Sequence, residues 1–344
     1  MRKTWLLCLT AAALASAAPA VRAGILLMNG AGATFPYPIY SKWFAEYAKV
    51  NPGVNFNYQS IGSGGGIRQI SSGTVDFGAS DGPMTDDQLK AAPAELMHLP
   101  TVLGGVVVTY NIPGVTATLR FPQKVLADIY LGKITRWNDP ALAGANPGVN
   151  LPAQDIVVVH RSDGSGTSYI WTDFLSKVSP TWAKAVGKGT SVNWPVGLGG
   201  KGNEGVAGLV AQTPNSVGYV ELGYAVSNKL PYGTVANTSG EYVECTLESV
   251  SKAAAAAANN MPADFRVSIT NGSGAGVYPI ASFTWLLVYR NQSDPVKGKA
   301  LVDFLNWMLE NGGKYAAELG YAPLPENVIK LERAAVAKIT VKGV

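Results

Sequence analysis

Residues 155–178 read DIVVVHRSDGSGTSYIWTDFLSKV: an apolar run, a turn of small polar residues, and apolar residues at helical spacing. The pattern predicts a strand over 155–160 and a helix over 168–177. A turn needs only glycine, and a helix cap needs only one serine, threonine or aspartate. The turn RSDGSGTS (161–168) therefore carries more hydrogen-bond donors than either role requires.

The same alternation of strand and helix runs along the chain and predicts an α/β fold. The predicted strands are 54–61, 75–80, 101–112, 155–160 and 283–290, and the predicted helices are 66–74, 122–132, 168–177, 295–311 and 325–339. The glycine- and threonine-rich segment 228–245 is predicted as a surface excursion with short strands, and the alanine run within 251–260 as the tail of a surface helix.

The first residues, MRKTWLLCLTAAALASAAPAVRAG, have the form of a secretory signal peptide, with cleavage expected after Ala23 or Ala20. Its loss removes three basic residues and no acid, so the formal net charge falls from +4 to +1. This near-neutral charge argues against nucleic acid as a partner.

The exported chain keeps only Cys245, which excludes an intramolecular disulfide. With 344 residues, 47% of them hydrophobic, one large domain or two are possible.

The turn at 161–168 is one of three loops of the same character. GAGATFP (30–36), IGSGGGIRQI (61–70) and DGSGTS (163–168) each lead into a predicted helix. Each offers backbone N–H groups at the positive end of that helix and adds a hydroxyl. The hydroxyls belong to Thr34, Ser63, Ser165 and Thr167. Converging loops of this kind would form a donor-rich site for a compact tetrahedral anion.

Two charged groups refine this hypothesis. Arg161 offers a planar donor suited to oxyanions, and Asp163 is expected to hold its guanidinium in place, although a turn or cap role would also suit it. Asp81, in DFGASDGPMT (76–85), would repel an anion unless that anion carries a proton. Phosphate carries one at neutral pH and sulfate does not, so Asp81 would reject sulfate. A cap or turn role for Asp81 is the alternative.

Several motifs in one order give the chain a resemblance to the periplasmic phosphate-binding proteins of bacterial high-affinity phosphate ABC transporters (the PstS family). They are GAGATFPYPIYSKW, IGSGGGIRQI, VDFGASDGPM, IYLGKITRWNDP, RSDGSGTSYIWTDFL, WPVGLGGKGNEGV and GYVELGYA. The resemblance extends from about residue 30 to the C-terminus and is looser over 228–275. The second loop departs from the family pattern, because it reads GSGGG where a second serine is common.

The resemblance implies a two-lobed periplasmic-binding-protein fold (type II-like), with a ligand cleft between lobes joined by two hinge strands. Lobe I would comprise residues 24–104 and 281–344, and lobe II residues 105–280. It also implies that the protein is a monomer that binds phosphate in the periplasm, without cofactor or metal, and delivers it to inner-membrane permease subunits and their ATPase. The implied phosphate ligands are Thr34, Phe35 (through its N–H), Ser63, Asp81, Arg161, Ser165, Gly166 and Thr167, with Asp163 as support.

Other functions remain open from the sequence. Three observations argue against an enzyme. Neither Ser63 nor Ser165 lies in a Gly-x-Ser-x-Gly elbow, and GGKGN (199–203) lacks the hydroxyl of a P-loop. His98 and His160 do not have the spacing of metal ligands. A site for sulfate, arsenate or molybdate is the main alternative, and an adhesion or sensing protein with the same fold is another. The glycine cluster GLGGKGNEG (197–205) has no role that the sequence explains.

Overall fold

The computed structural model describes residues 24–258 and 261–343; the predicted signal peptide, residues 1–23, lies outside the described residues. The strands are β1 (Leu26–Gly32), β2 (Val54–Ser60), β3 (Phe77–Ser80), β4 (Leu96–Asn111), β5 (Arg120–Phe121), β6 (Val157–Arg161), β7 (Leu198–Gly200), β8 (Ser216–Glu221), β9 (Thr234–Ala236), β10 (Tyr242–Val243), β11 (Ala281–Tyr289), β12 (Asn291–Gln292) and β13 (Thr340–Val341). The helices are α1 (Tyr37–Val50), α2 (Ser63–Ser71), α3 (Asp86–Ala91), α4 (Gln123–Tyr130), α5 (Pro140–Ala145), α6 (Gly166–Val178), α7 (Pro180–Ala185), α8 (Gly202–Gln212), α9 (Leu222–Ser227), α10 (Leu247–Ala258), α11 (Pro295–Asn311) and α12 (Glu326–Val336), with short 3₁₀ turns η1 (Gly312–Tyr315) and η2 (Ala317–Leu319).

One mixed sheet runs the length of the molecule in the order β2-β1-β3-β11-β4-β8-β6-β7. The long strand β4 joins its two parts. Its residues as far as Gly105 pair with β11, and from Val106 onward it pairs with β8. The strand therefore changes partners in its middle, which divides the sheet into two parts.

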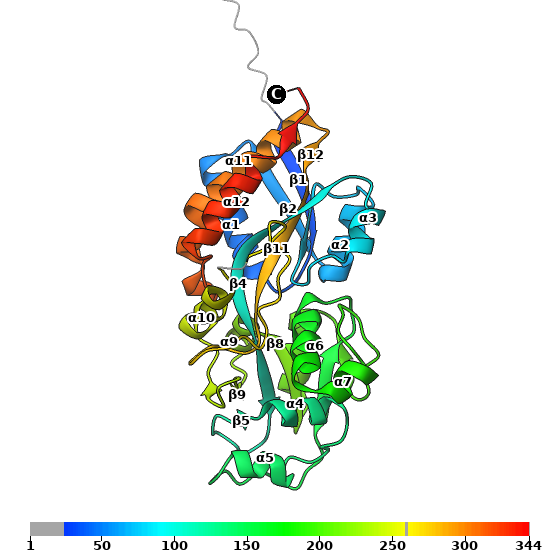
Figure 1. Ribbon diagram of the computed structural model, residues 1–344, viewed down its shortest axis with the longest axis vertical. Helices are drawn as coiled ribbons and strands as arrows, with labels where there is room; N and C mark the ends of the chain where they lie inside the picture. Colours follow the sequence, from blue (N-terminus) through cyan, green and yellow to red (C-terminus); the bar gives the residue numbers. More distant parts are fainter. Residues whose placement is uncertain (1–23, 259–260, 344) are drawn as a thin grey trace, which may run out of the picture.

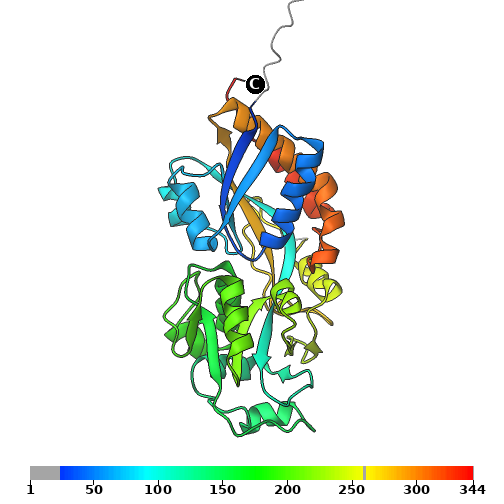
Figure 2. The same ribbon diagram turned by 180° about the vertical axis from the view of Figure 1, so that it is seen from behind.

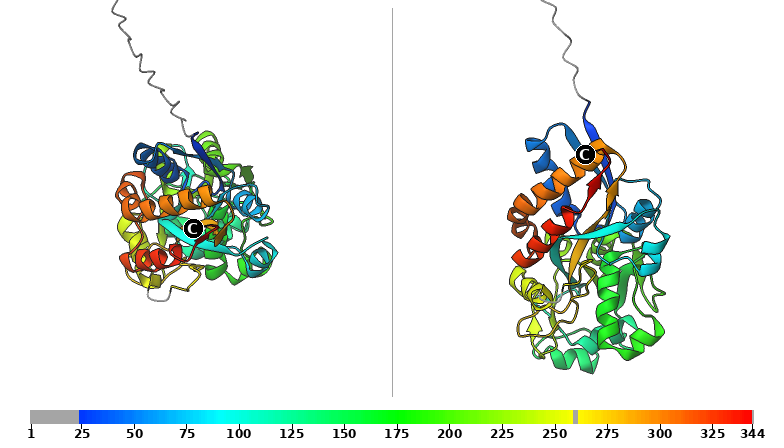
Figure 3. Two further views of the ribbon diagram at one scale, coloured as in Figure 1. Left: turned by 90° about the horizontal axis from the view of Figure 1, so that it is seen from above. Right: turned by 45° about the horizontal axis from the view of Figure 1, so that its top comes forward.

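Figure 1 shows the two parts as an upper and a lower half, with β4 and β11 between them. In the upper half, α1, α11 and α12 lie on one side of the sheet and α2 and α3 on the other, as the reverse view in Figure 2 also shows. The lower half holds α4 to α8. Figure 3 shows that the start of β1 and the last described residues lie at the same end of the upper half, away from the lower half. The predicted α/β class is confirmed.

The predicted elements are found, with one difference that matters for the site. The helix predicted over 66–74 begins three residues earlier, at Ser63, and ends at Ser71. Its glycines suggest a loop, but they pack too tightly for side chains. A Cβ on Gly66 would lie 2.6 Å from the Cα of Gly32 and 2.7 Å from the carbonyl oxygen of Ala79. Close packing against the backbone, and not loop flexibility, therefore explains glycine here.

Other differences concern elements that the sequence pattern missed. The strand predicted over 101–112 begins at Leu96. The sheet strands β1 and β8, the helix α8 and the short helices α3, α5, α7 and α9 were not predicted. The region 228–245 contains the short strands β9 and β10, as expected. Among the residues that the structure describes, no helix is both long and apolar enough to cross a membrane.

Glu332 on α12 lies in the interior of the protein, where no hydrogen bond from the described residues compensates its carboxyl group for the loss of water. It is fully buried, and neither carboxyl oxygen has a hydrogen-bond partner among the described residues. Burial raises the pKa of Glu332 well above its ordinary value of 4.5. The folded protein therefore binds a proton that the unfolded chain releases above about pH 4.5, so stability should fall as the pH rises from there.

We expect Glu332→Leu to stabilise the protein by about 1–3 kcal/mol near pH 8, because it removes an unsatisfied buried group while nearly conserving volume. The gain should shrink toward about pH 4.5, where the unfolded chain also begins to hold the proton. Urea unfolding at several pH values measures this difference. Glu326→Gln, at an exposed position of the same helix, is the control. A Glu332→Leu variant less stable than the parent near pH 8 would contradict the argument.

Candidate functional site

The first predicted loop joins β1 to α1, and tyrosine side chains hold its backbone. Three successive carbonyl oxygens each accept a hydrogen bond from a different tyrosine hydroxyl. Tyr58 donates to Ala33 (2.8 Å), Tyr224 to Thr34 (2.6 Å) and Tyr321 to Phe35 (2.6 Å). These bonds fix the orientation of the peptide planes. Because the Phe35 side chain has no hydrogen-bonding atom, only the backbone of Phe35 can donate to an anion.

The second loop meets the third across the boundary between the two halves. The Gly64 N–H donates to the Gly164 carbonyl at 2.8 Å, so it contributes to closing the cleft. A Cβ on Gly64 would lie 3.0 Å from the Cα of Gly164. A side chain at position 64 would therefore require the facing loop to shift slightly. Ser63, the first residue of α2, is fully buried.

The third loop holds a buried ion pair. The Arg161 Nε and Nη2 atoms donate to the two Asp163 carboxyl oxygens at 2.8 and 2.7 Å, which is the predicted pairing. Burial alone would raise the pKa of Asp163, but the hydrogen bond and charge of Arg161 lower it below its usual value. The guanidinium is thus held rigidly while its Nη1 and Nη2 atoms keep further N–H groups for a ligand.

The start of α6 offers the donors expected of an anion site. The Ser165 hydroxyl accepts from the Ser168 N–H at 3.0 Å and so caps the helix. Its hydrogen remains available to donate, so capping and ligand binding are compatible for this residue. The N–H groups of Gly166 and Thr167 lie in the first turn, where no intrahelical acceptor exists. Both residues are buried.

Asp81 lies directly after β3 and faces the start of α6. Its Oδ1 atom accepts from the Thr284 hydroxyl at 2.8 Å, and Oδ2 lies 3.4 Å from the Ser63 hydroxyl. A Cβ on Gly166 would lie only 2.4 Å from Oδ2, which shows how near the carboxyl is to that loop. Burial raises the pKa of Asp81 to about 7, against the opposing effects of Thr284, Arg161 and Ser63. The carboxyl can therefore exchange a proton near neutral pH.

A fourth loop completes the site, and the sequence reasoning missed its role. The glycine cluster 197–205 forms β7 and the start of α8. The Gly202 N–H donates to Asp163 at 3.1 Å, and the Asn203 side chain donates to the hydroxyls of Thr34 (2.7 Å) and Thr167 (3.1 Å). The sequence did carry a signal for this loop, because the cluster is a fourth glycine-rich turn that precedes a helical pattern.

The structure brings all the sequence-predicted site residues to one place. They come from both halves of the molecule, and the described contacts link them across the boundary. Each of them is almost entirely buried, apart from the supporting Asp163. The arrangement is a buried cluster of hydroxyls and first-turn amides, with the Arg161 guanidinium and the Asp81 carboxyl of raised pKa. Such a set can hold a small protonated oxyanion.

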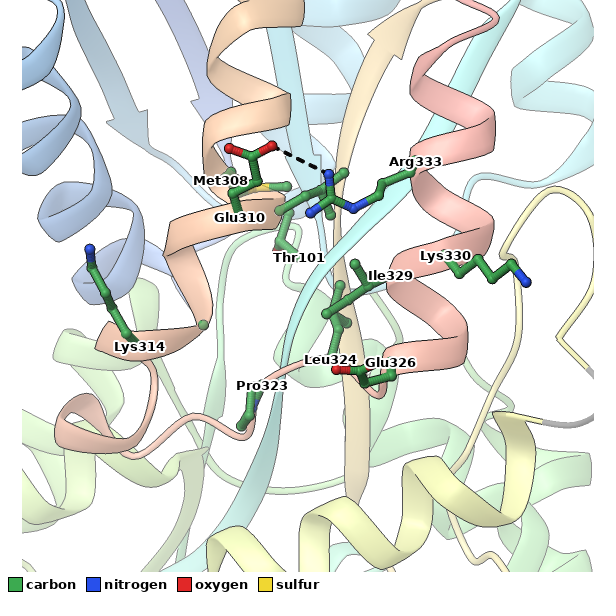
Figure 4. A pocket seen from close by; sticks show the side chains of 12 residues that line it. Thr101, Met308, Glu310, Lys314, Pro323, Leu324, Glu326, Ile329, Lys330 and Arg333 are labelled. Atoms are coloured by element: carbon green, nitrogen blue, oxygen red, sulfur yellow. Dashed lines mark hydrogen bonds and ion pairs between the residues drawn. The ribbon is translucent and has the colours of Figure 1, made fainter.

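A surface pocket lies elsewhere, between α11, η1 and α12 (Figure 4). Its Arg333 side chain pairs with Glu310 at 3.5 Å, and the side chains of Lys314 and Lys330 point away from the hollow. No set of donors converges there as it does in the cleft. The pocket therefore does not compete with the cleft as an anion site.

Comparison with known proteins identifies relatives over most of the chain. The family model of the PBP superfamily domain matches residues 15–311. The chain is 48% identical to the phosphate-binding protein PstS of Xylella fastidiosa (strain Temecula1), over 88% of this chain and 83% of that protein. The corresponding protein of Pasteurella multocida is 48% identical over 88% of each. PstS of Methanocaldococcus jannaschii is 39% identical over 91% of this chain and 86% of the relative.

Solved structures share the fold at lower identity. The periplasmic phosphate-binding protein PfluDING, solved with phosphate bound, superposes with a TM-score of 0.71 at 22% identity, covering 90% of this chain and 93% of that one. An ABC-type phosphate transport receptor from Vibrio cholerae gives a TM-score of 0.57 at 20% identity, covering 87% and 100%. Together with the family model, these likenesses confirm the predicted two-lobed binding-protein fold.

Proposed function

The chain belongs to the PstS family of phosphate-binding proteins, and on that premise we propose that it binds inorganic phosphate and delivers it to the membrane permease of a phosphate ABC importer. The observation that carries the proposal is the composition of the closed cleft. Donors from separate helix starts surround the buried Asp81 carboxyl, whose pKa burial raises to about 7. Among tetrahedral oxyanions, this combination suits one that is both a strong acceptor and a proton donor.

We propose that phosphate is held by hydrogen bonds alone. Thr34, Ser63, Ser165 and Thr167 would donate through their hydroxyls, and Phe35, Gly166 and Thr167 through backbone N–H groups. Arg161 would contribute a charged donor held by Asp163. Asp81 would accept the phosphate proton. Because closure would exclude water from these buried residues, each unmatched polar group would cost the full desolvation penalty, which makes the match selective.

We propose that the cleft lies between lobe I, residues 24–104 and 281–344, and lobe II, residues 105–280. Two observations support these boundaries. The pairing of β4 changes from β11 to β8 between Gly105 and Val106. Ala281, the first residue of β11, lies opposite Gly105. Bending at these strands would open the cleft, and phosphate contacts from both lobes would then favour the closed state.

Two further parts of the proposal follow from the sequence. The chain is proposed to reach the periplasm after cleavage of its signal peptide near Ala23 or Ala20, and to act by binding and not by catalysis. The hydroxyls of Ser63 and Ser165 contact Asp81 and the Ser168 amide, with no histidine as a base in their described contacts. Incubation with a chromogenic phosphate ester tests the second point, because turnover would contradict it.

Isothermal titration of the mature chain with phosphate, and separately with sulfate, tests the main proposal. We expect phosphate to bind with one site per chain and sulfate to bind at least about 100-fold more weakly, because its oxygens would face the Asp81 lone pairs with no hydrogen between them. Arsenate and molybdate titrations identify the alternative oxyanions. Absence of phosphate binding would overturn the proposed function.

A further inference from the structure

We propose that Asn203 is a positioning residue that sets the hydrogen-bond polarity of the anion site: it makes the Thr34 and Thr167 hydroxyls donate toward the ligand. This inference rests on the proposed binding of phosphate and adds a residue to it. Asn203 is the second residue of α8 and is fully buried at the boundary between the two halves.

The orientation of the Asn203 amide is fixed by the backbone. The Glu221 N–H donates to Asn203 Oδ1 at 3.0 Å. An N–H group can only donate, so the side-chain atom that faces it has to be the oxygen. The Nδ2 atom must therefore face the two threonine hydroxyls. A flipped amide would set the Nδ2 hydrogens against the Glu221 N–H, at the cost of a buried unsatisfied donor.

Each threonine hydroxyl accepts hydrogen bonds that occupy its lone pairs. Thr167 Oγ1 lies 3.1 Å from Asn203 Nδ2 and 3.4 Å from Arg161 Nη1. Thr34 Oγ1 lies 2.7 Å from Asn203 Nδ2 and 3.4 Å from the Asn203 backbone nitrogen. Neither hydroxyl donates to a protein acceptor among the described contacts. A hydroxyl has one hydrogen and two acceptor sites, so what remains of each is its hydrogen.

The fixed direction of these two hydroxyls matters for recognition. A free hydroxyl can turn to donate or accept. Asn203 and Thr167 both belong to the lower half, so the Thr167 hydroxyl is already turned before the anion arrives, whereas the Thr34 hydroxyl is turned as the halves close. The site then presents hydrogens to an acceptor without the cost of reorienting them, as preorganisation requires. Because Thr34 belongs to the upper half and Thr167 to the lower half, the same amide also joins the halves in the closed state.

The test is a double-mutant cycle on the mature chain, with phosphate affinity measured by calorimetry. We expect Asn203→Ala to weaken binding by about 10-fold or more, which is the usual effect of losing hydrogen bonds that act on a charged ligand. In a background that carries Thr34→Val and Thr167→Val, the same change should cost less than about 3-fold, because the hydroxyls it orients are gone. A purely structural role would give equal losses in both backgrounds and would overturn the proposal.

Two further variants keep the test decisive. Asn203→Asp keeps the shape but replaces the Nδ2 donor with an acceptor, so the hydroxyls must turn toward it and binding should fall at least as far as with alanine. Phosphate binding unchanged in this variant would refute the inference even if Asn203→Ala misfolds.

Asn146→Ala is the control. Asn146 is also buried and hydrogen-bonded, to Arg120 and Leu142 at a distance from the cleft. This change should lower the stability of the protein but leave its phosphate affinity unchanged. Failure of the parent protein to bind phosphate refutes the proposed function, whereas parental binding with unaffected Asn203 variants refutes only this inference.

Discussion

Replacing Gly166 with alanine is expected to weaken phosphate binding by roughly 100-fold while leaving the ligand-free protein folded. A Cβ at this position would lie 2.3 Å from the Ser63 hydroxyl oxygen and 2.4 Å from Asp81 Oδ2, both across the cleft. In the proposed open state the two lobes separate, so that state would not carry the clash. Alanine keeps the backbone N–H at position 166. The loss of phosphate affinity would therefore report impaired closure of the cleft and not the removal of a hydrogen-bond donor.

Calorimetry gives the affinity of this variant, and small-angle scattering with and without phosphate reports whether it still closes. Gly208→Ala is the matched control, because Gly208 lies within α8 and a Cβ there would meet no atom within 4 Å. That variant should bind as the parent does and be slightly more stable, since alanine favours helix over glycine. Parental affinity in the Gly166→Ala variant would show that the closed cleft seen here is not the binding state.

Replacing Asp81 with asparagine is expected to lower the preference for phosphate over sulfate by at least about 100-fold. In the proposed site of the parent, the carboxylate accepts a hydrogen bond from the proton that phosphate carries and sulfate lacks. An asparagine of the same shape offers an amide that can donate to sulfate, so the repulsion disappears. Titration of the variant with both anions measures the ratio. A variant that still rejects sulfate as strongly as the parent would disprove the role of Asp81.

The pKa of Asp81 gives this prediction a pH dependence. Burial raises that pKa to about 7. Above this value the carboxylate is charged and rejects sulfate, whereas below it the protonated carboxyl can itself donate a hydrogen bond. Sulfate affinity of the parent should therefore rise as the pH falls from about 8 to about 6. The Asp81→Asn variant has no titrating group at this position, so its sulfate affinity should change little over the same range.

The sequence identified most of the candidate site because its signals are local. Small polar residues before a helical pattern define caps and first-turn amides, and this depends only on neighbouring residues. The same local logic located α6, α11 and the strands around them. It was less successful at α2, where glycines that pack against Gly32 and Ala79 have the appearance of a loop. Tight backbone packing cannot be read from one segment alone.

The residues that sequence reasoning missed act through long-range contacts. Asn203 is separated by 169 positions from Thr34, and Tyr321 by 286 from Phe35. No periodicity or cap rule connects such positions. The glycine cluster at 197–205 was visible as a feature, but its role depends on which loop it meets, and only the folded chain brings it to Asp163 and Thr167.

What the sequence by itself determined is the alternation of strands and helices, the supply of anion donors at helix starts, and an acid placed where a donor would be expected. These properties follow from backbone geometry over a few residues. The tertiary structure alone decided that the loops meet in one buried cleft, that burial moves the Asp81 pKa toward neutrality, and that Asn203 directs two hydroxyls. Desolvation and hydrogen-bond polarity depend on everything that surrounds a group, and those surroundings come from distant parts of the chain.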